Sequence, residues 1–160
     1  MSPTSERVIA RPFLLVIVTF MAAILFCALD ARAQSGSDKK ADKPLYVEYK
    51  GVQIGMSADD VRKKLGAPKE KGDTQDFYMF SEKESAQVFY DKGKVMAVSV
   101  SYLEAKQAPL PKSIFGLDVE AKPDGGIFKM VRYPDAGYYV SYNRTPGDDP
   151  LVTVTMQRIQ

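Results

Sequence analysis

Residues 55–68, GMSADDVRKKLGAP, contain the start and stop signals of one short helix. Ser57 is the expected N-cap, because its hydroxyl can accept a hydrogen bond from an unpaired amide of the first turn. Gly66 can adopt the left-handed conformation that ends many helices, and Pro68 prevents continuation. A helix of about ten residues is not stable alone in water, so this segment must pack against other elements. That requirement constrains the fold more than any other feature of the chain.

The side chains of this helix divide into a buried face and a solvated face. Val61 and Leu65 are four residues apart and share a face, while Met56 and Val61 have the spacing of a hydrophobic staple. Asp59 and Asp60 lie in the first turn, where negative charge is favourable next to the helix dipole. We therefore interpret the segment as a scaffold helix and not as an active centre. The residues of this structural signature are Met56, Ser57, Val61, Leu65, Gly66 and Pro68.

Three segments rich in apolar and aromatic residues follow the helix, at 77–80, 86–90 and 95–102. This composition predicts strands, and the turn-forming residues between the segments indicate antiparallel hairpins. In the last segment, Met96 and every second residue after it should face the helix, while Val95 and every second residue after it should face away from the helix.

The second half of the chain has a similar pattern of apolar residues. Val88 aligns with Val140, and Val98 aligns with Val154. We predict an α+β fold with a short helix packed on an antiparallel sheet, built as a tandem repeat of helix-plus-three-strand units. A single six-stranded meander is the alternative, because all half-buried strands resemble one another.

The N-terminus has the pattern of a secretory signal. Arginines precede a long apolar run, and Ala31-Arg32-Ala33 has the small residues of a cleavage site. We expect cleavage near Ala33 and a periplasmic or secreted protein. The apolar run is also long enough to remain as an N-terminal membrane anchor. The predicted segments are a signal peptide at 1–33, a flexible linker at 34–44 and a single domain at 45–160, with repeats at about 51–103 and 110–160.

The residue composition limits the chemistry that the exported chain can perform. The chain has no histidine, and its only cysteine, Cys27, lies in the predicted signal. A bulky Phe26 before Cys27 argues against lipidation. Disulfides, thiol nucleophiles and His/Cys metal sites are therefore excluded after cleavage. The pair Asp148-Asp149 lacks the spacing of a calcium loop. We expect no enzyme activity, no metal and no cofactor, with a carboxylate hydrolase as the weakest hypothesis.

A protein partner is the remaining expectation. The net charge is +2 and falls to +1 without residues 1–33, so there is no electrostatic reason to bind nucleic acid. Basic residues of the helix could contact an acidic partner, and Tyr138 and Tyr139 cannot both face the interior of one sheet. Exposed tyrosines favour protein interfaces. The candidate partner-binding residues are Tyr133, Tyr138, Tyr139, Arg62 and Lys63.

The helix pattern G-M-S-x-x-x-V-x-x-x-L-G-x-P, followed by strands and a D-x-G-x-V turn at Asp91, Gly93 and Val95, resembles the SmpA/OmlA family of BamE-like outer-membrane assembly lipoproteins. A duplicated version would resemble the fold of the β-lactamase inhibitor protein. The resemblance implies a small, non-catalytic periplasmic module that binds proteins or envelope components. The lipidated cysteine of that family is not matched here.

Two functional hypotheses follow. The first is an exported, non-enzymatic protein-binding module of the cell envelope, with outer-membrane protein assembly as one role. The alternative is a secreted enzyme inhibitor that inserts the aromatic loop 133–139 into an enzyme cleft. In both cases, membrane contact would occur only through an uncleaved signal or through the partner.

Overall fold

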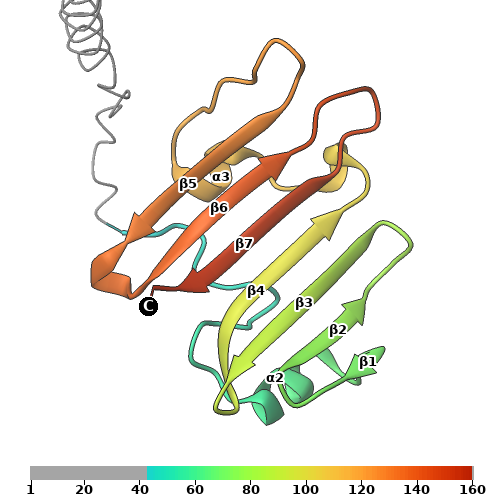
Figure 1. The fold of residues 1–160 in the computed structure, drawn as a ribbon, viewed down its shortest axis with the longest axis vertical. Helices are drawn as coiled ribbons and strands as arrows, with labels where there is room; N and C mark the ends of the chain where they lie inside the picture. The colour runs from blue at the N-terminus through green and yellow to red at the C-terminus, as the bar shows by residue number, and fades with distance from the viewer. Residues whose placement is uncertain (1–42, 160) are drawn as a thin grey trace, which may run out of the picture. The chain divides into compact units, whose positions relative to one another are not determined.

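Seven antiparallel strands form one sheet in the computed structural model, which describes residues 43–159 (Figure 1). The described residues lie within one compact unit. The predicted signal peptide and nearly all of the predicted linker lie outside the described residues. No helix between residues 43 and 159 is long and apolar enough to cross a membrane.

The elements, in chain order, are α2 Ala58–Leu65, β1 Glu70–Lys71, β2 Gln75–Met79, β3 Glu84–Asp91, β4 Lys94–Tyr102, the 3₁₀ turn η1 Ala105–Gln107, α3 Pro111–Phe115, β5 Ile127–Tyr133, the 3₁₀ turn η2 Pro134–Ala136, β6 Tyr138–Arg144 and β7 Val152–Arg158.

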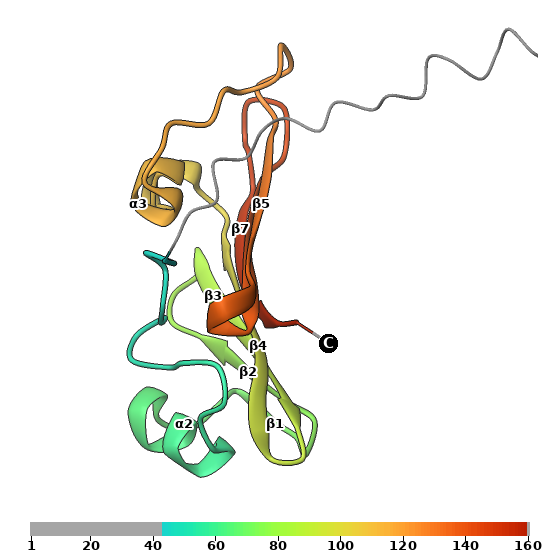
Figure 2. The same cartoon turned by 90° about the vertical axis from the view of Figure 1, so that its left-hand side faces the viewer.

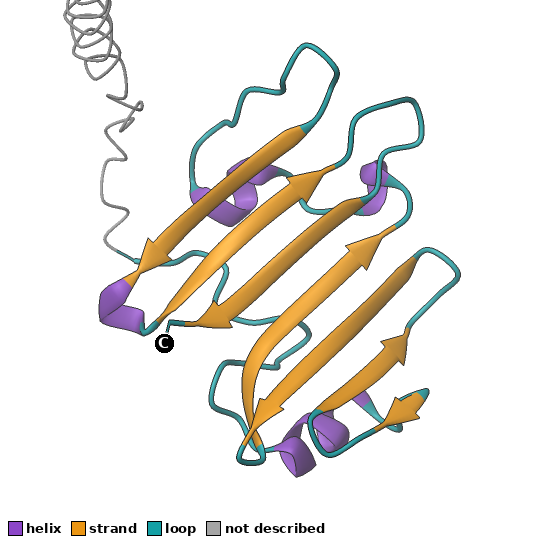
Figure 3. Cartoon of the chain, in the orientation of Figure 1, coloured by secondary structure: helices purple, strands orange, loops and turns teal. Residues whose placement is uncertain are grey.

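The strand order is β1-β2-β3-β4-β7-β6-β5 (Figures 1 and 3). A simple meander would place β5 beside β4, but β4 pairs with β7 instead. The meander alternative is therefore wrong. The α+β class with a short helix and an antiparallel sheet is confirmed, and β5 forms the sheet edge opposite β1.

Both helices and the chain segment 45–54 lie on the same face of the sheet (Figure 2). We call this the inner face and the opposite one the outer face. The core lies between these segments and the inner face, because alternate strand residues turn their side chains toward it. The largest fully buried apolar side chains are Val52, Val61, Val88, Val95, Val98, Val100, Ile114, Val140, Val152, Val154 and Met156.

The structure confirms the N-terminal cap of α2 and corrects its C-terminus. The Ser57 hydroxyl accepts from the Asp60 amide at 3.2 Å, and Val61 is fully buried. Met56 and Leu65 are partly buried and pack against the core. The helix has 8 residues, and Gly66 has φ 84° with ψ −162°. That backbone conformation is not left-handed helical, but it still requires glycine.

A β-bulge overturns the expected orientation of Met96. Phe89 pairs with Ala97, whereas Tyr90 pairs with Val95, so Met96 is an extra residue in β4. The extra residue reverses the alternation at the start of the strand. Val95 is fully buried in the core, whereas Met96 is half-buried and lies outside it. Val95 therefore occupies the place predicted for Met96.

The register of the sheet also tests the alignment between the two halves of the chain. Val88 pairs with Val98, but Val140 pairs with Met156 and not with Val154. If Val88 corresponded to Val140 and Val98 to Val154, Val140 would have to pair with Val154. It pairs instead with Met156, two residues away, so the two proposed alignments cannot both hold. A shift of two residues keeps every side chain on the same face, which is why the sequence pattern did not reveal it.

Candidate functional site

The acidic residues at the start of α2 have structural partners. Asp60 accepts hydrogen bonds from the Ser57 hydroxyl at 2.7 Å and from the Lys63 ammonium at 3.1 Å. These hydrogen bonds, first from Ser57 and then from Lys63, lower the pKa of Asp60. Asp59 is exposed and lies 3.6 Å from Arg62. The capping interpretation of both aspartates agrees with these contacts.

Arg62 does not belong to an exposed basic surface. Its guanidinium donates to both carboxylate oxygens of Asp76, at 2.9 Å and 3.1 Å, and also to the Gly72 carbonyl at 3.1 Å. The guanidinium also lies 5.8 Å from the centre of the Tyr90 ring. Arg62 therefore connects α2 to β2 and β3, whereas its neighbour Lys63 is exposed.

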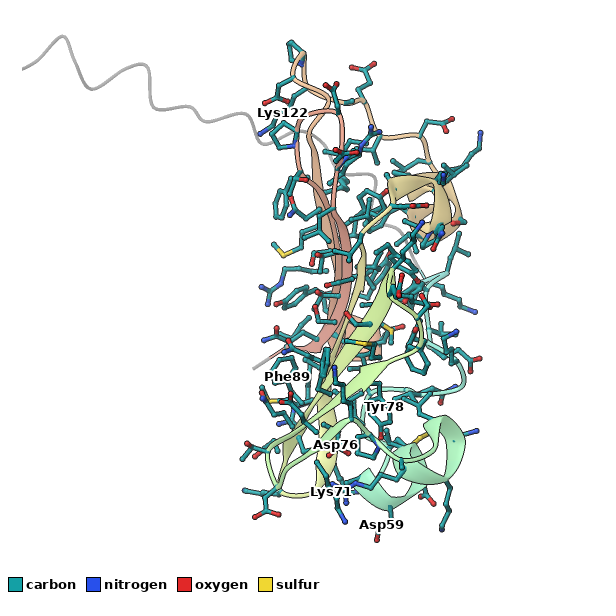
Figure 4. All side chains as sticks on the ribbon, turned by 90° about the vertical axis from the view of Figure 1, so that its right-hand side faces the viewer. Asp59, Lys71, Asp76, Tyr78, Phe89 and Lys122 are labelled. Atoms are coloured by element: carbon teal, nitrogen blue, oxygen red, sulfur yellow. The ribbon has the colours of Figure 1, made fainter. Side chains whose placement is uncertain are left out.

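Asp76 is the buried charge that sequence reasoning missed. Its residue exposure is 1%, and it also accepts from the Tyr90 hydroxyl at 2.8 Å and from the Gly72 amide at 3.2 Å. Burial by itself would raise its pKa, but the hydrogen bonds from Arg62, Tyr90 and Gly72 outweigh burial and hold the pKa of Asp76 below its ordinary value. Figure 4 shows Asp76 and Tyr78 on β2, close to α2. The residues around Asp76, GDTQDF, read as a turn, so no pattern in the sequence indicated burial.

A second polar cluster surrounds Glu84 on β3. Its carboxylate accepts from the Tyr49 hydroxyl at 2.7 Å and lies 3.4 Å from the Lys50 ammonium. The ammonium also lies over the Phe80 ring, 4.8 Å from its centre. Burial, followed by the hydrogen bond to Glu84, raises the pKa of the Tyr49 phenol above its ordinary value. Tyr49 and Lys50 belong to segment 45–54, so these contacts to Glu84 and Phe80 hold that segment on the sheet.

The predicted tyrosine surface is only partly present. Tyr133 and Tyr138 are buried at 3% and 8% exposure, with ring centres 6.1 Å apart. Burial raises the pKa of both phenols. Tyr139 points to the outer face and donates to Gln157 at 2.7 Å. Of the three tyrosines proposed for partner binding, only Tyr139 is available on a surface, since the other two belong to the core.

The outer face forms three transverse rows of paired residues. In the second and third rows, apolar side chains stand at both margins of the face, and serine, threonine and amide side chains fill its middle; the first row has polar ends and carries Phe89 and Ala97 inside. Figure 4 shows Phe89 on this side, opposite Tyr78. Exposure is 50% for Met79, 61% for Phe128 and 41% for Met130. The rows, read from β2 to β5, are Gln75, Phe89, Ala97, Gln157, Tyr139, Arg132; then Phe77, Gln87, Ser99, Thr155, Ser141, Met130; and then Met79, Ser85, Ser101, Thr153, Asn143, Phe128.

The described residues do not assemble a metal site. No group of three or more acidic or cysteine side chains within residues 43–159 is placed to hold a metal ion. Asp148 and Asp149 lie in the exposed turn between β6 and β7. The carboxylates of Asp76 and Glu84 are each held by a tyrosine and a basic side chain.

These observations define a class: an α+β protein whose antiparallel sheet has helices on one face and a mixed apolar and hydroxyl surface on the other. Comparisons with protein-family models, with curated proteins and with solved structures find no match for the chain. The outer face is therefore identified as a candidate site from its own geometry.

Proposed function

We propose that this chain is an exported, non-enzymatic module of the cell envelope that binds a folded protein partner on the outer face of its sheet. The outer face carries this proposal, because large apolar side chains are exposed there while both helices lie on the inner face (Figure 2). Contiguous apolar surface that remains exposed is typical of interaction sites.

The spacing of the apolar margins favours a folded domain over a peptide. Five strand-to-strand steps separate β2 from β5. At about 4.8 Å per step, Met79 and Phe128 at the two ends of one row are about 24 Å apart. A strand aligned with the sheet covers only one margin, and a peptide that reaches both must lie extended across the strands for about eight residues, whereas the face of a globular domain covers both at once.

The chemistry of the outer face supports a protein partner. In its three rows, only Arg132 is charged. Nucleic acid and anionic membrane surfaces are bound by clusters of basic residues, and this face has none. The Ser99 and Thr155 hydroxyls, 3.0 Å apart at the centre, provide donors and acceptors for a polar interface.

We also propose that the two halves are tandem helix-plus-three-strand units of the BamE-like kind. The strand order β2-β3-β4 followed by β7-β6-β5 supports this, because the two triplets are related by a two-fold rotation between β4 and β7. Ser99 and Thr155 lie opposite each other at the middle of that pair. The resemblance to the SmpA/OmlA family makes outer-membrane protein assembly the first process to test.

The alternative, a secreted inhibitor with an aromatic loop, has less support. The loop between β5 and β6 forms a short 3₁₀ turn at Pro134–Ala136, and the tyrosines on either side of it, Tyr133 and Tyr138, are buried. An inhibitor of this fold would therefore have to use the outer face as well.

Affinity capture with matched variants tests the proposal. The exported chain serves as bait for an envelope extract, in parallel with Met79→Glu/Phe128→Glu on the outer face and Val47→Glu/Leu117→Glu as controls. The control residues have 46% and 42% exposure but belong to segments outside the sheet. We expect wild type and control to retain the same protein and the outer-face variant to lose it. Equal retention by all three, or no retained protein, would overturn the proposal.

A further inference from the structure

Arg144, the last residue of β6, has an unusual environment for an arginine. Its Nε atom is buried and has no hydrogen-bond partner. Among residues 43–159, no carboxylate forms an ion pair with its guanidinium. Of the other three arginines in this range, Arg62 and Arg158 pair with aspartates, and Arg132 is exposed to solvent. Buried polar groups are normally hydrogen-bonded, so the Arg144 guanidinium is an exception among the described residues.

Two hollows meet at Arg144. The first, of about 330 Å³, has an acidic rim that includes Glu104, Asp148 and Asp149. The second, of about 230 Å³, lies between α3 and the sheet. Its walls are mainly apolar and include Leu110, Pro111, Val119, Ile127 and Tyr142.

The charges around the second hollow leave Arg144 as its free cation. Lys112 also lines the hollow, but its ammonium pairs with Asp118 at 3.0 Å. An anion that enters the hollow would therefore meet one unpaired guanidinium among mainly apolar walls. A guanidinium recognises a planar carboxylate through two parallel hydrogen bonds.

We infer that the hollow beside Arg144 binds a small monocarboxylate with an apolar tail, whose carboxylate accepts from the guanidinium and whose tail lies against Val119 and Ile127. Glu104 is paired with Lys83 and Lys106, but Asp148 and Asp149 of the first hollow repel anions, and they repel anions of higher charge, such as phosphate, more strongly than a monocarboxylate. The volume lies below the range typical of drug-sized ligands, so the tail must be short. The shared chemistry fits the C-terminus of a peptide with an apolar last residue and also a short-chain free acid.

An NMR titration of the full-length chain tests this inference. The probes are N-acetyl-leucine, which represents a peptide C-terminus, and hexanoate, which represents a free acid; N-acetyl-leucinamide and hexanol are their uncharged counterparts. We expect the acids to shift the amide signals of Val119 and Ile127 with millimolar affinity and the uncharged counterparts to bind at least about tenfold more weakly. Tighter binding of N-acetyl-leucine identifies a chain terminus as the ligand, and tighter binding of hexanoate identifies a free acid.

Variants at Arg144 provide the second readout. Arg144→Gln should weaken the binding of both acids at least about tenfold. Arg132→Gln is the matched control, since Arg132 is exposed on the outer face of β5. Equal binding of acid and uncharged counterpart by the wild type would overturn the inference even if Arg144→Gln failed to fold. Binding within twofold of wild type by a folded Arg144→Gln, or no shift with either acid, would also overturn it. These results are independent of the capture experiment, because the hollow lies on the inner side of the sheet.

Discussion

Replacement of Asp76 by asparagine should destabilise the fold strongly, although the two side chains have nearly the same shape. The carboxylate accepts four hydrogen bonds: two from Arg62, one from Tyr90 and one from Gly72. An asparagine keeps one acceptor oxygen, so two of these four donors would face an NH₂ group instead. Each hydrogen bond to a charged group contributes about 1.5–3 kcal/mol, and loss of one member of a buried ion pair costs about 3–5 kcal/mol.

The partial exposure of Arg62 sets the expected loss at the lower end of that range. Its side chain remains 22% exposed, so water can solvate part of the orphaned guanidinium. We expect Asp76→Asn to lower the free energy of unfolding by about 3 kcal/mol, which corresponds to a decrease in Tm of about 12 °C for a domain of this size. Urea denaturation followed by circular dichroism measures this loss of stability. An m-value equal to that of the wild type would show that wild type and Asp76→Asn expose the same amount of surface on unfolding.

Asp59→Asn is the matched control for this measurement. Asp59 lies on α2 together with Arg62, and its carboxylate also approaches the Arg62 guanidinium, at 3.6 Å, but its side chain is 86% exposed. Exposed ion pairs contribute little, so this variant should lose far less stability than Asp76→Asn. If Asp76→Asn lost less than about 1 kcal/mol, or no more than Asp59→Asn, the argument that the Arg62–Asp76 pair holds α2 on the sheet would be refuted.

Three further predictions concern pH, the bulge and the helix end. Because the pKa of Asp76 is lower in the folded state than in the unfolded chain, its contribution to stability is present above about pH 4 and is lost as the pH falls through the folded-state pKa; the urea midpoints of wild type and Asp76→Asn should therefore stay apart above about pH 4 and converge as the pH falls below it, and parallel curves would contradict this. Val95→Ala should lower the free energy of unfolding by about 1–3 kcal/mol and Met96→Ala by clearly less, since only Val95 lies in the core; the reverse order in thermal denaturation would refute the bulge assignment. Gly66→Ala should cost about 1–3 kcal/mol through backbone strain alone, because no atom lies within 4 Å of the added Cβ; an unchanged Tm would show that the backbone adapts.

Local signals in the sequence were sufficient for most of the elements. The α2 cap follows from Ser57, and the hairpin between β3 and β4 follows from the turn around Lys92 and Gly93. These features depend on residues that are close together in the chain, so their patterns are visible without tertiary structure. The inward orientation of Ala86, Val88 and Tyr90 was predictable for the same reason.

The features that were missed depend on contacts between distant segments. The bulge at Met96 depends on how β3 and β4 pair, and a pattern of alternation within β4 alone cannot reveal an inserted residue. The partner of Arg62 is 14 residues away, and its position became clear only when α2 packed against β2. For that reason a residue assigned to a basic surface proved to be half of a buried ion pair.

The sequence by itself determined that a short capped helix must pack on antiparallel strands, and that a chain without histidine offers few routes to catalysis. Those conclusions depend on hydrogen-bonding capacity, side-chain chemistry and periodicity, which are local properties. Tertiary structure alone decided that β4 pairs with β7, that Tyr133 and Tyr138 are buried, and that the outer face keeps its apolar margins. The reason is physical: alternation shows that a strand has two different faces, but only the packing of the helices determines which face of the assembled sheet they cover.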